Sequence, residues 1–191
     1  MAVRLFIAAN VPAAAQKALA DTARQLSARW RSGDVRWTPP QNQHLTLRFL
    51  GDTSAAAQQK LTAALDELVM TESSFVLHIE GTGVFPLPEK GPARVLWAGF
   101  RDDDGRRSLM ALQRRLEACV RRLGWQSESR PYHPHLTLGR VRHGASSHGG
   151  GREHLGPDAT GLPVHEVVLM RSDLKPSGPR YTPLHAARFG G

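Results

Sequence analysis

The string His-Leu-Thr-Leu occurs twice in this chain, and this repeat constrains the fold more than any other feature. The copies are His44-Leu-Thr-Leu47 and His135-Leu-Thr-Leu138, separated by about half the length of the 191-residue chain. Each copy follows a proline-containing approach, with Pro39-Pro40 before the first and Pro131 and Pro134 before the second. A repeat at half-length in a matched context predicts two related halves that each contribute the same strand.

Strand periodicity assigns the repeated residues to faces, because side chains two positions apart point to the same side. His44, Thr46 and Arg48 are therefore expected to share one face in the first copy, and His135 and Thr137 in the second. The leucines point the other way and can pack under a helix. A polar His/Thr face must be solvated, hydrogen-bonded or part of a cleft.

The rest of the chain alternates short apolar runs with amphipathic segments. Three helices are expected, the first opening at Pro12, the second capped by Thr53 or Ser54, and the third beginning after Asp102-Asp-Asp104. Strands are expected at 5–9, 35–37, 43–50, 75–79, 94–100, 133–141, 164–174 and 181–189. The order lacks the strict alternation of a doubly wound parallel sheet, so the prediction is an α+β fold with antiparallel sheets.

Composition excludes several classes of protein. A single cysteine, Cys119, cannot form an internal disulfide or a Cys-rich zinc cluster, and its place beside an apolar helix face predicts a small core residue. No apolar run approaches the roughly 20 residues that span a bilayer, so a soluble cytoplasmic protein, monomeric by default, is expected. Lys and Arg total 25 against 17 Asp and Glu, a net charge of +8 that attracts phosphates and polyanions.

Two histidines and two threonines on facing strands suit phosphoryl chemistry without an obligatory metal. An imidazole titrates near pH 6.5, so one histidine can act as base while the other acts as acid. Threonine hydroxyls can donate hydrogen bonds to the non-bridging phosphoryl oxygens. In-line attack needs base and acid on opposite sides of phosphorus, and a strained 2′,3′-cyclic phosphate suits this arrangement best.

The paired motifs resemble the 2H phosphoesterase superfamily. The surrounding segments 35–40, 44–51 and 130–138 resemble its bacterial and archaeal RNA 2′,3′-cyclic phosphodiesterase branch, formerly called 2′-5′ RNA ligase. The N-terminal strand and the segment from Leu169 through Tyr181 also fit, so the resemblance covers nearly the whole chain.

The resemblance implies one bilobal domain over residues 1–191, in which two antiparallel sheets related by a pseudo-two-fold flank a cleft, with helices on the outer faces. It implies metal-independent hydrolysis of RNA 2′,3′-cyclic phosphate ends, tRNA fragments among them, to 2′-phosphomonoesters, with 2′-5′ joining as a further activity and no cofactor. By motif, His44 resembles the proton donor and His135 the proton acceptor. Thr46 and Thr137 would hold the phosphoryl oxygens.

Several further residues are weaker candidates for the same site. Arg140 is the best candidate for an additional phosphate contact, and Arg48 and Arg130 are the others. Three aromatic residues, if they are not core residues, could stack a nucleobase: Trp37, Tyr132 and Phe85. Gly139, directly after the second motif, leaves the detailed shape of the substrate site open.

Three other functions stay open from the sequence. His133 and His135 have metal-ligand spacing, and a metallohydrolase could take a third ligand from His143, His148 or His154 in the glycine-rich segment 142–152. A non-catalytic RNA-binding module would keep the strands without the reaction. A small cyclic nucleotide could replace RNA as the substrate.

Overall fold

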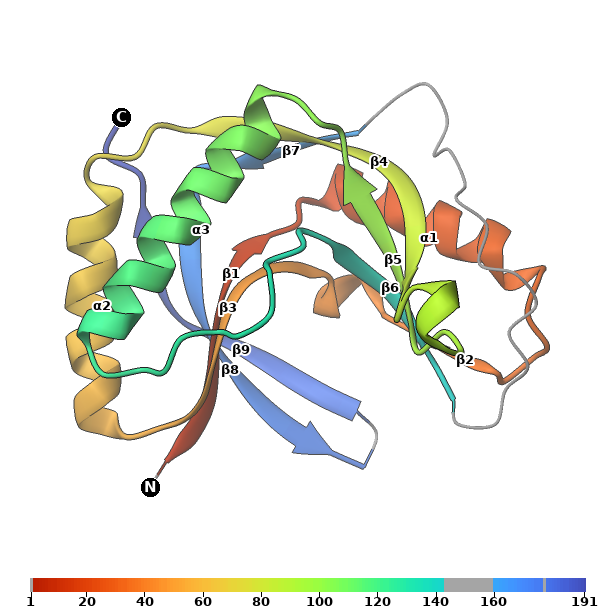
Figure 1. Ribbon diagram of the computed structural model, residues 1–191, viewed down its shortest axis with the longest axis horizontal. Helices are drawn as coiled ribbons and strands as arrows, with labels where there is room; N and C mark the ends of the chain where they lie inside the picture. The colour runs from red at the N-terminus through yellow and green to blue at the C-terminus, as the bar shows by residue number, and fades with distance from the viewer. Residues whose placement is uncertain (1, 143–159, 177) are drawn as a thin grey trace.

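The computed structural model describes residues 2–142, 160–176 and 178–191 (Figure 1). The helices are α1 (Ala13–Ser27), α2 (Ala55–Val69) and α3 (Asp104–Arg122). The strands are β1 (Val3–Asn10), β2 (Val35–Trp37), β3 (His44–Thr53), β4 (Phe75–Phe85), β5 (Val95–Phe100), β6 (Leu136–Val141), β7 (Gly161–Val164), β8 (Glu166–Lys175) and β9 (Gly178–Arg188). The predicted α+β class is confirmed.

The strands form one strongly curled antiparallel sheet rather than the two separate sheets expected from the sequence (Figure 1). Their order is β7-β4-β5-β6-β3-β1-β8-β9, and β2 pairs with β6 beside this path. The halves meet where β3 pairs with β6, at the single register position Leu45 opposite Leu136. The two motif strands are therefore neighbours at the centre of the sheet.

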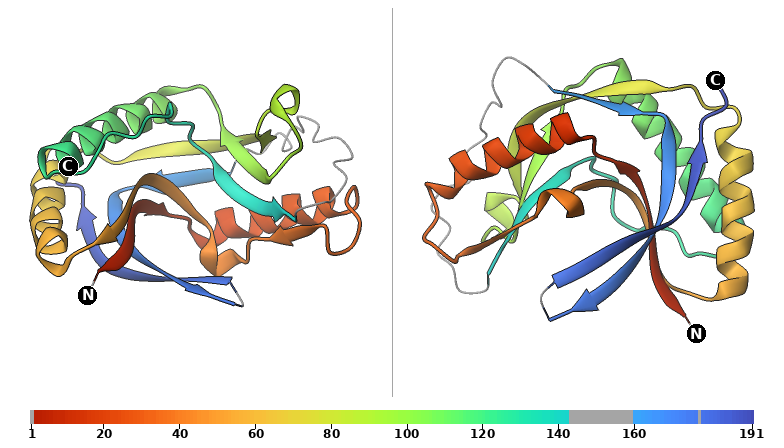
Figure 2. Two further views of the ribbon diagram at one scale, coloured as in Figure 1. Left: turned by 60° about the horizontal axis from the view of Figure 1, so that its bottom comes forward. Right: turned by 180° about the vertical axis from the view of Figure 1, so that it is seen from behind.

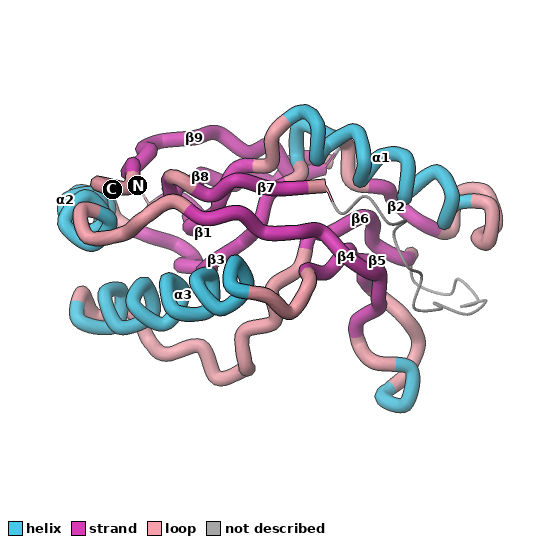
Figure 3. Tube along the Cα trace, turned by 90° about the horizontal axis from the view of Figure 1, so that it is seen from above, coloured by secondary structure: helices cyan, strands magenta, loops and turns pink. Residues whose placement is uncertain are grey.

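A strand–helix–strand unit is present in each half, and its helix also contacts the motif strand of the other half. The units are β1–α1–β3 and β5–α3–β6, and in each the first strand pairs antiparallel with the motif strand. Helix α1 packs against β6, and α3 packs against β3 as well as against β4 and α2 (Figure 3). Each motif strand thus contacts the helix of the other unit.

The apolar face of the motif strands lies in the main core. All four motif leucines are at most 1% exposed, namely Leu45, Leu47, Leu136 and Leu138. They pack with the apolar stripes of the three helices, and Cys119 is buried as predicted. The expected helix starts are also confirmed, because Ser54 accepts a hydrogen bond from the Ala57 amide and Asp103 from the Arg106 amide.

Three elements differ from the sequence expectation. Strand β4 continues from Ile79 to Phe85 through two glycines, and β7 was not expected at all. The strand expected at 133–141 begins only at Leu136, so His135 lies directly before β6. Gly83 is required in β4 because the Trp97 ring occupies the space where a Cβ would stand. The loop expected at 142–152 lies outside the described residues beyond Arg142. No helix in the described ranges is both long and apolar enough to cross a membrane.

Candidate active site

The two motifs lie side by side in opposite directions at the centre of the sheet. Leu45 faces Leu136 across an antiparallel register. His44 and Thr46 flank Leu45 in the chain, and His135 and Thr137 flank Leu136. Since the leucines between them point into the core, the two histidines and two threonines share the opposite face.

Both imidazoles are held by the same local hydrogen bond. His44 Nδ1 lies 2.8 Å from the carbonyl oxygen of Asn42, and His135 Nδ1 lies 2.8 Å from that of His133. A carbonyl can only accept, so in each ring Nδ1 carries the proton and donates it. This bond fixes the tautomer and leaves Nε2 as the nitrogen that can exchange protons with a ligand.

Aromatic rings surround His44 on the side of the sheet formed by β1 and the β8–β9 hairpin. Its ring centroid lies 4.8 Å from that of Phe6 and 4.9 Å from that of Tyr181. Phe6 and Tyr181 belong to a small second core with residues of β1 and β8. This second core supports the imidazole from behind.

His135 has a matching aromatic environment from β4 and β5. Its ring lies 5.1 Å from Phe85, which also contacts Trp97 at 5.2 Å. His133 packs 4.9 Å from Trp97 and 5.1 Å from Phe85. Each motif histidine is thus fixed both by a backbone carbonyl and by aromatic neighbours.

The environment lowers the pKa of both imidazoles below 6.5. For His44 the main cause is burial, opposed by the bond to Asn42, and the positive charges of His135 and Arg140 lower the pKa further. For His135 the main cause is again burial, opposed by the bond to the His133 carbonyl, with the charges of His133 and Arg140 adding to the effect. The two motif imidazoles and Arg140 are therefore within electrostatic reach of one another.

The threonine hydroxyls are available to a ligand. Thr46 and Thr137 are half-buried, and neither hydroxyl has a hydrogen-bond partner among the described residues. The backbone of Thr46 is fixed instead, because its carbonyl accepts a 3.0 Å bond from the Tyr132 hydroxyl. Two oriented hydroxyls beside two imidazoles can donate to an oxyanion.

The expectation that Arg48 shares the His/Thr face is wrong, because a β-bulge interrupts the alternation. In the β1–β3 pair, Ile7 faces Arg48 but Ala8 faces Thr46, so Leu47 is an extra residue. Arg48 consequently follows the leucines into the interior and is 8% exposed. Phe49, which strict alternation would bury, is 57% exposed and contacts Phe6 at 6.0 Å.

The second motif strand has the equivalent bulge. In the β5–β6 pair, Leu96 faces Gly139 and Trp97 faces Thr137, so Leu138 is the extra residue. Gly139 takes the interior position that Arg48 takes in the first copy. A Cβ there would lie 2.7 Å from Val35 Cγ1, which explains why this position has no side chain.

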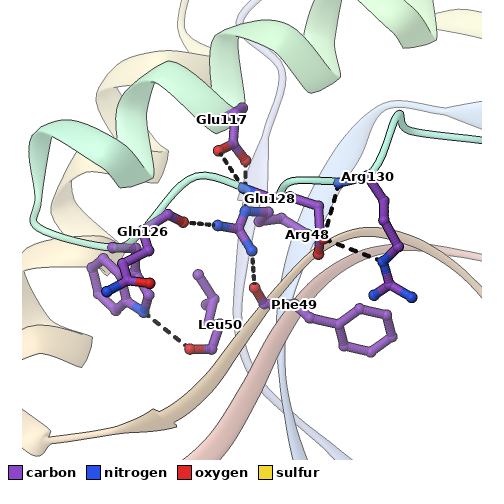
Figure 4. Close-up of polar contacts among 8 residues, drawn as sticks. Arg48, Phe49, Leu50, Glu117, Gln126, Glu128 and Arg130 are labelled. Carbon is purple, nitrogen blue, oxygen red and sulfur yellow. Dashed lines mark hydrogen bonds and ion pairs between the residues drawn. The ribbon is translucent and has the colours of Figure 1, made fainter.

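Arg48 joins the first motif strand to the segment that leads into the second motif (Figure 4). Its guanidinium bonds Glu117 of α3 at 2.6 Å and the backbone carbonyls of Phe49 and Gln126. Trp125 donates to the Leu50 carbonyl at 3.2 Å. These bonds, with that from Tyr132 to Thr46, attach the segment 125–132 to β3 where β6 has separated from it.

Arg140 and Arg130 have different positions. Arg140 is exposed, and its charge acts on both motif imidazoles. Arg130 lies on the segment before the second motif, where its 84% exposed side chain pairs with Glu128 at 3.4 Å (Figure 4). The geometry therefore favours Arg140 over Arg130 as a ligand contact.

The three aromatic residues considered for nucleobase stacking also have different environments. Tyr132 and Trp37 pack against the main core, and the Tyr132 hydroxyl is used by the Thr46 carbonyl. Phe85 stands edge-on to His135. The exposed ring on the His/Thr side of β3 is Phe49, which sequence reasoning missed because only the bulge brings it to that side.

The metal-ligand hypothesis concerned His133 and His135 together with a third ligand. Their ring centroids are 6.5 Å apart, and no group of three ligand-type side chains occurs within the described parts of the chain. The third ligands considered, His143, His148 and His154, lie outside the described residues.

Comparisons with known proteins agree with this geometry. A family model described as the 2′-5′ RNA ligase superfamily matches residues 10–176. An RNA 2′,3′-cyclic phosphodiesterase of Methanothermobacter thermautotrophicus is 31% identical over 195 residues, covering 99% of this chain and 100% of that protein.

Solved structures show the same fold. A Thermus thermophilus protein superposes with a TM-score of 0.84 at 29% identity, covering 98% of both chains. Escherichia coli LigT complexed with 3′-AMP superposes with a TM-score of 0.81 at 27% identity, covering 100% of both chains.

Proposed function

This chain belongs to the 2′-5′ RNA ligase superfamily, in the family of RNA 2′,3′-cyclic phosphodiesterases, and we propose that it hydrolyses 2′,3′-cyclic phosphate ends of RNA to 2′-phosphomonoesters. The reaction is proposed to need no metal and to use the whole chain as one domain, with the substrate in a cleft between its halves. The single observation that carries this proposal is the matched pair of imidazoles, each donating Nδ1–H to a carbonyl two residues earlier.

The proposed reaction is an in-line displacement at phosphorus. His135 Nε2 accepts a proton from water as the water oxygen attacks, and His44 Nε2 gives a proton to the departing O3′ of the ribose. The bond from phosphorus to O3′ breaks, and O2′ keeps the phosphate. The assignment of acid and base follows the family motif, and the nearly symmetric site supports either direction of proton transfer.

The remaining groups of the proposed site stabilise charge. Thr46 and Thr137 donate hydrogen bonds to the non-bridging oxygens, and Arg140 neutralises the phosphate. A neutral His44 must gain a proton before it can act as the acid. The negative phosphate favours this gain, because an anion beside an imidazole raises its pKa.

The proposal is tested with an RNA oligonucleotide that ends in a 2′,3′-cyclic phosphate. His44→Ala and His135→Ala should each lower turnover by about 10²–10⁴-fold, since each removes one general acid–base group. His185→Gln, which alters a histidine paired with Asp66 elsewhere on the surface, is the matched control and should keep the parental rate.

Near-parental turnover of both alanine variants would refute the proposal. Product analysis with an added 5′-hydroxyl oligonucleotide separates hydrolysis from 2′-5′ joining. Turnover that persists in metal-stripped protein with EDTA would exclude the metallohydrolase alternative, and tight RNA binding without product at any pH would support the non-catalytic one.

A further inference from the structure

Arg36 and Arg140 are direct partners on neighbouring strands. The β2–β6 register sets one opposite the other, and both side chains are exposed. Residues opposite each other on antiparallel strands point to the same face with Cβ atoms about 4.5–5.5 Å apart, and two like charges in this position are destabilising. An anionic ligand beside the two arginines would relieve this repulsion.

The arginine pair lies on the face of the motif histidines. The charge of Arg140 acts on both imidazoles. Burial raises the pKa of Tyr181, and the charges of Arg140 and Arg36 both oppose this effect, so each guanidinium lies within electrostatic reach of the tyrosine. Tyr181 contacts His44 at 4.9 Å, which places the pair on the His44 side of the site.

The Arg36 side chain packs beside the β8–β9 hairpin, which extends beyond the rest of the sheet (Figures 1 and 2). A Cβ on Gly178, at the turn of this hairpin, would collide with Arg36 Nη2. Gly178 therefore leaves room for the guanidinium. Asn42 donates from its side chain to the Pro179 carbonyl at 3.1 Å and accepts from His44 through its own carbonyl. The start of β9, at Gly178 and Pro179, therefore contacts Arg36 directly and is connected to His44 through Asn42.

We propose that Arg36 binds the phosphodiester on the 5′ side of the terminal nucleotide, next to the cyclic phosphate on which Arg140 acts. The inference rests on the proposed function, which sets the terminal ribose beside His44 because His44 protonates its O3′. The 5′ carbon of that ribose carries the preceding phosphate, and Arg36 lies one strand beyond Arg140. The site then recognises an oligonucleotide end in preference to a 2′,3′-cyclic nucleoside.

The test compares two substrates that differ by one phosphate. These are a nucleoside 2′,3′-cyclic phosphate with a 5′-hydroxyl and the same molecule with a 5′-phosphate. We expect kcat/KM about tenfold or more higher for the 5′-phosphorylated substrate, because hydrogen bonds to charged groups are among the strong ones. Arg36→Gln should bring the ratio of the two values close to one, and Arg36→Lys should restore part of it.

Arg114→Gln is the control, since it removes one exposed arginine charge from α3 and should leave the ratio unchanged. A binding measurement with a non-hydrolysable RNA oligonucleotide adds a second readout. The slope of log K against log salt should fall in Arg36→Gln by about 0.7, the contribution of one phosphate contact on a single strand.

Two results would overturn the inference: a wild-type ratio near one, or an equal loss on both substrates in Arg36→Gln. The ratio of kcat/KM values for the two substrates in the wild-type protein tests the inference even if the Arg36→Gln variant does not fold. Failure of the proposed function would look different, because the wild-type protein would then hydrolyse neither substrate.

Discussion

Replacing Arg48 by methionine should destabilise the protein strongly, although the side chain touches neither motif imidazole. Methionine keeps the aliphatic volume and removes the charge. The change leaves Glu117 without its 2.6 Å partner and two carbonyls without their donor. Breaking a buried ion pair by removing one partner costs about 3–5 kcal/mol.

The expected loss lies near the lower end of this range, about 3 kcal/mol. Glu117 is 21% exposed and keeps the bond from the Glu128 amide at 3.2 Å, so part of its charge stays solvated or paired. Small proteins unfold in urea with slopes of about 1–3 kcal/mol per molar, so the unfolding midpoint should fall by about 1–3 M at constant slope.

Urea titration followed by tryptophan fluorescence measures this shift. Arg101→Met is the matched control, because its pair with Glu80 is exposed and should contribute at most about 1 kcal/mol. Arg48→Met/Glu117→Met should recover part of the loss, since the stranded carboxylate is gone. A loss below about 1 kcal/mol in Arg48→Met would refute the view that this guanidinium attaches the segment 125–132 to β3.

Tyr132→Phe removes only the bond to the Thr46 carbonyl and should cost about 0.5–1.5 kcal/mol in the same titration; no change would mean that the bond adds nothing. Gly139→Ala forces a methyl group against Val35 and should cost about 1–3 kcal/mol, measured as a lower urea midpoint. Both motif imidazoles have lowered pKa values in the free protein, so the bell-shaped pH profile of kcat/KM should centre below pH 6.5. The alkaline limb of kcat/KM should lie at lower pH than that of kcat, because bound phosphate raises the pKa of the imidazole that must be protonated. Arg140→Gln removes a charge that lowers both pKa values and should move the residual kcat/KM profile to higher pH; an unmoved profile would contradict the electrostatic link.

The repeat predicted the centre of the fold because the His-Leu-Thr-Leu pattern, which is visible in the sequence, also carries the candidate site residues. Alternating His, Thr and Leu specify a strand with one polar and one apolar face, and both copies have that form in the structure except that His135 lies directly before β6. The helices could also be predicted from the sequence, since Ser54 and Asp103 are capping residues that precede apolar stripes. The family resemblance predicted the roles of the histidines, which spacing alone leaves open.

What the sequence did not predict depends on pairing between distant segments. The bulges after Thr46 and Thr137 arise from register with β1 and β5, so the interior position of Arg48 and the exposed one of Phe49 are invisible to simple alternation. The joining of two sheets into one depends on Leu45 meeting Leu136. Strand β7 is four residues long and contains a proline, which is too little pattern to stand out.

The exchange of helices across the centre of the sheet has a mechanical consequence. Since α1 contacts β6 and α3 contacts β3, pulling the two halves apart would remove helix contacts from each motif strand. Separating the halves would therefore disturb the packing of both motif strands together. The spacing between the two motif imidazoles is therefore tied to the packing that joins the two halves.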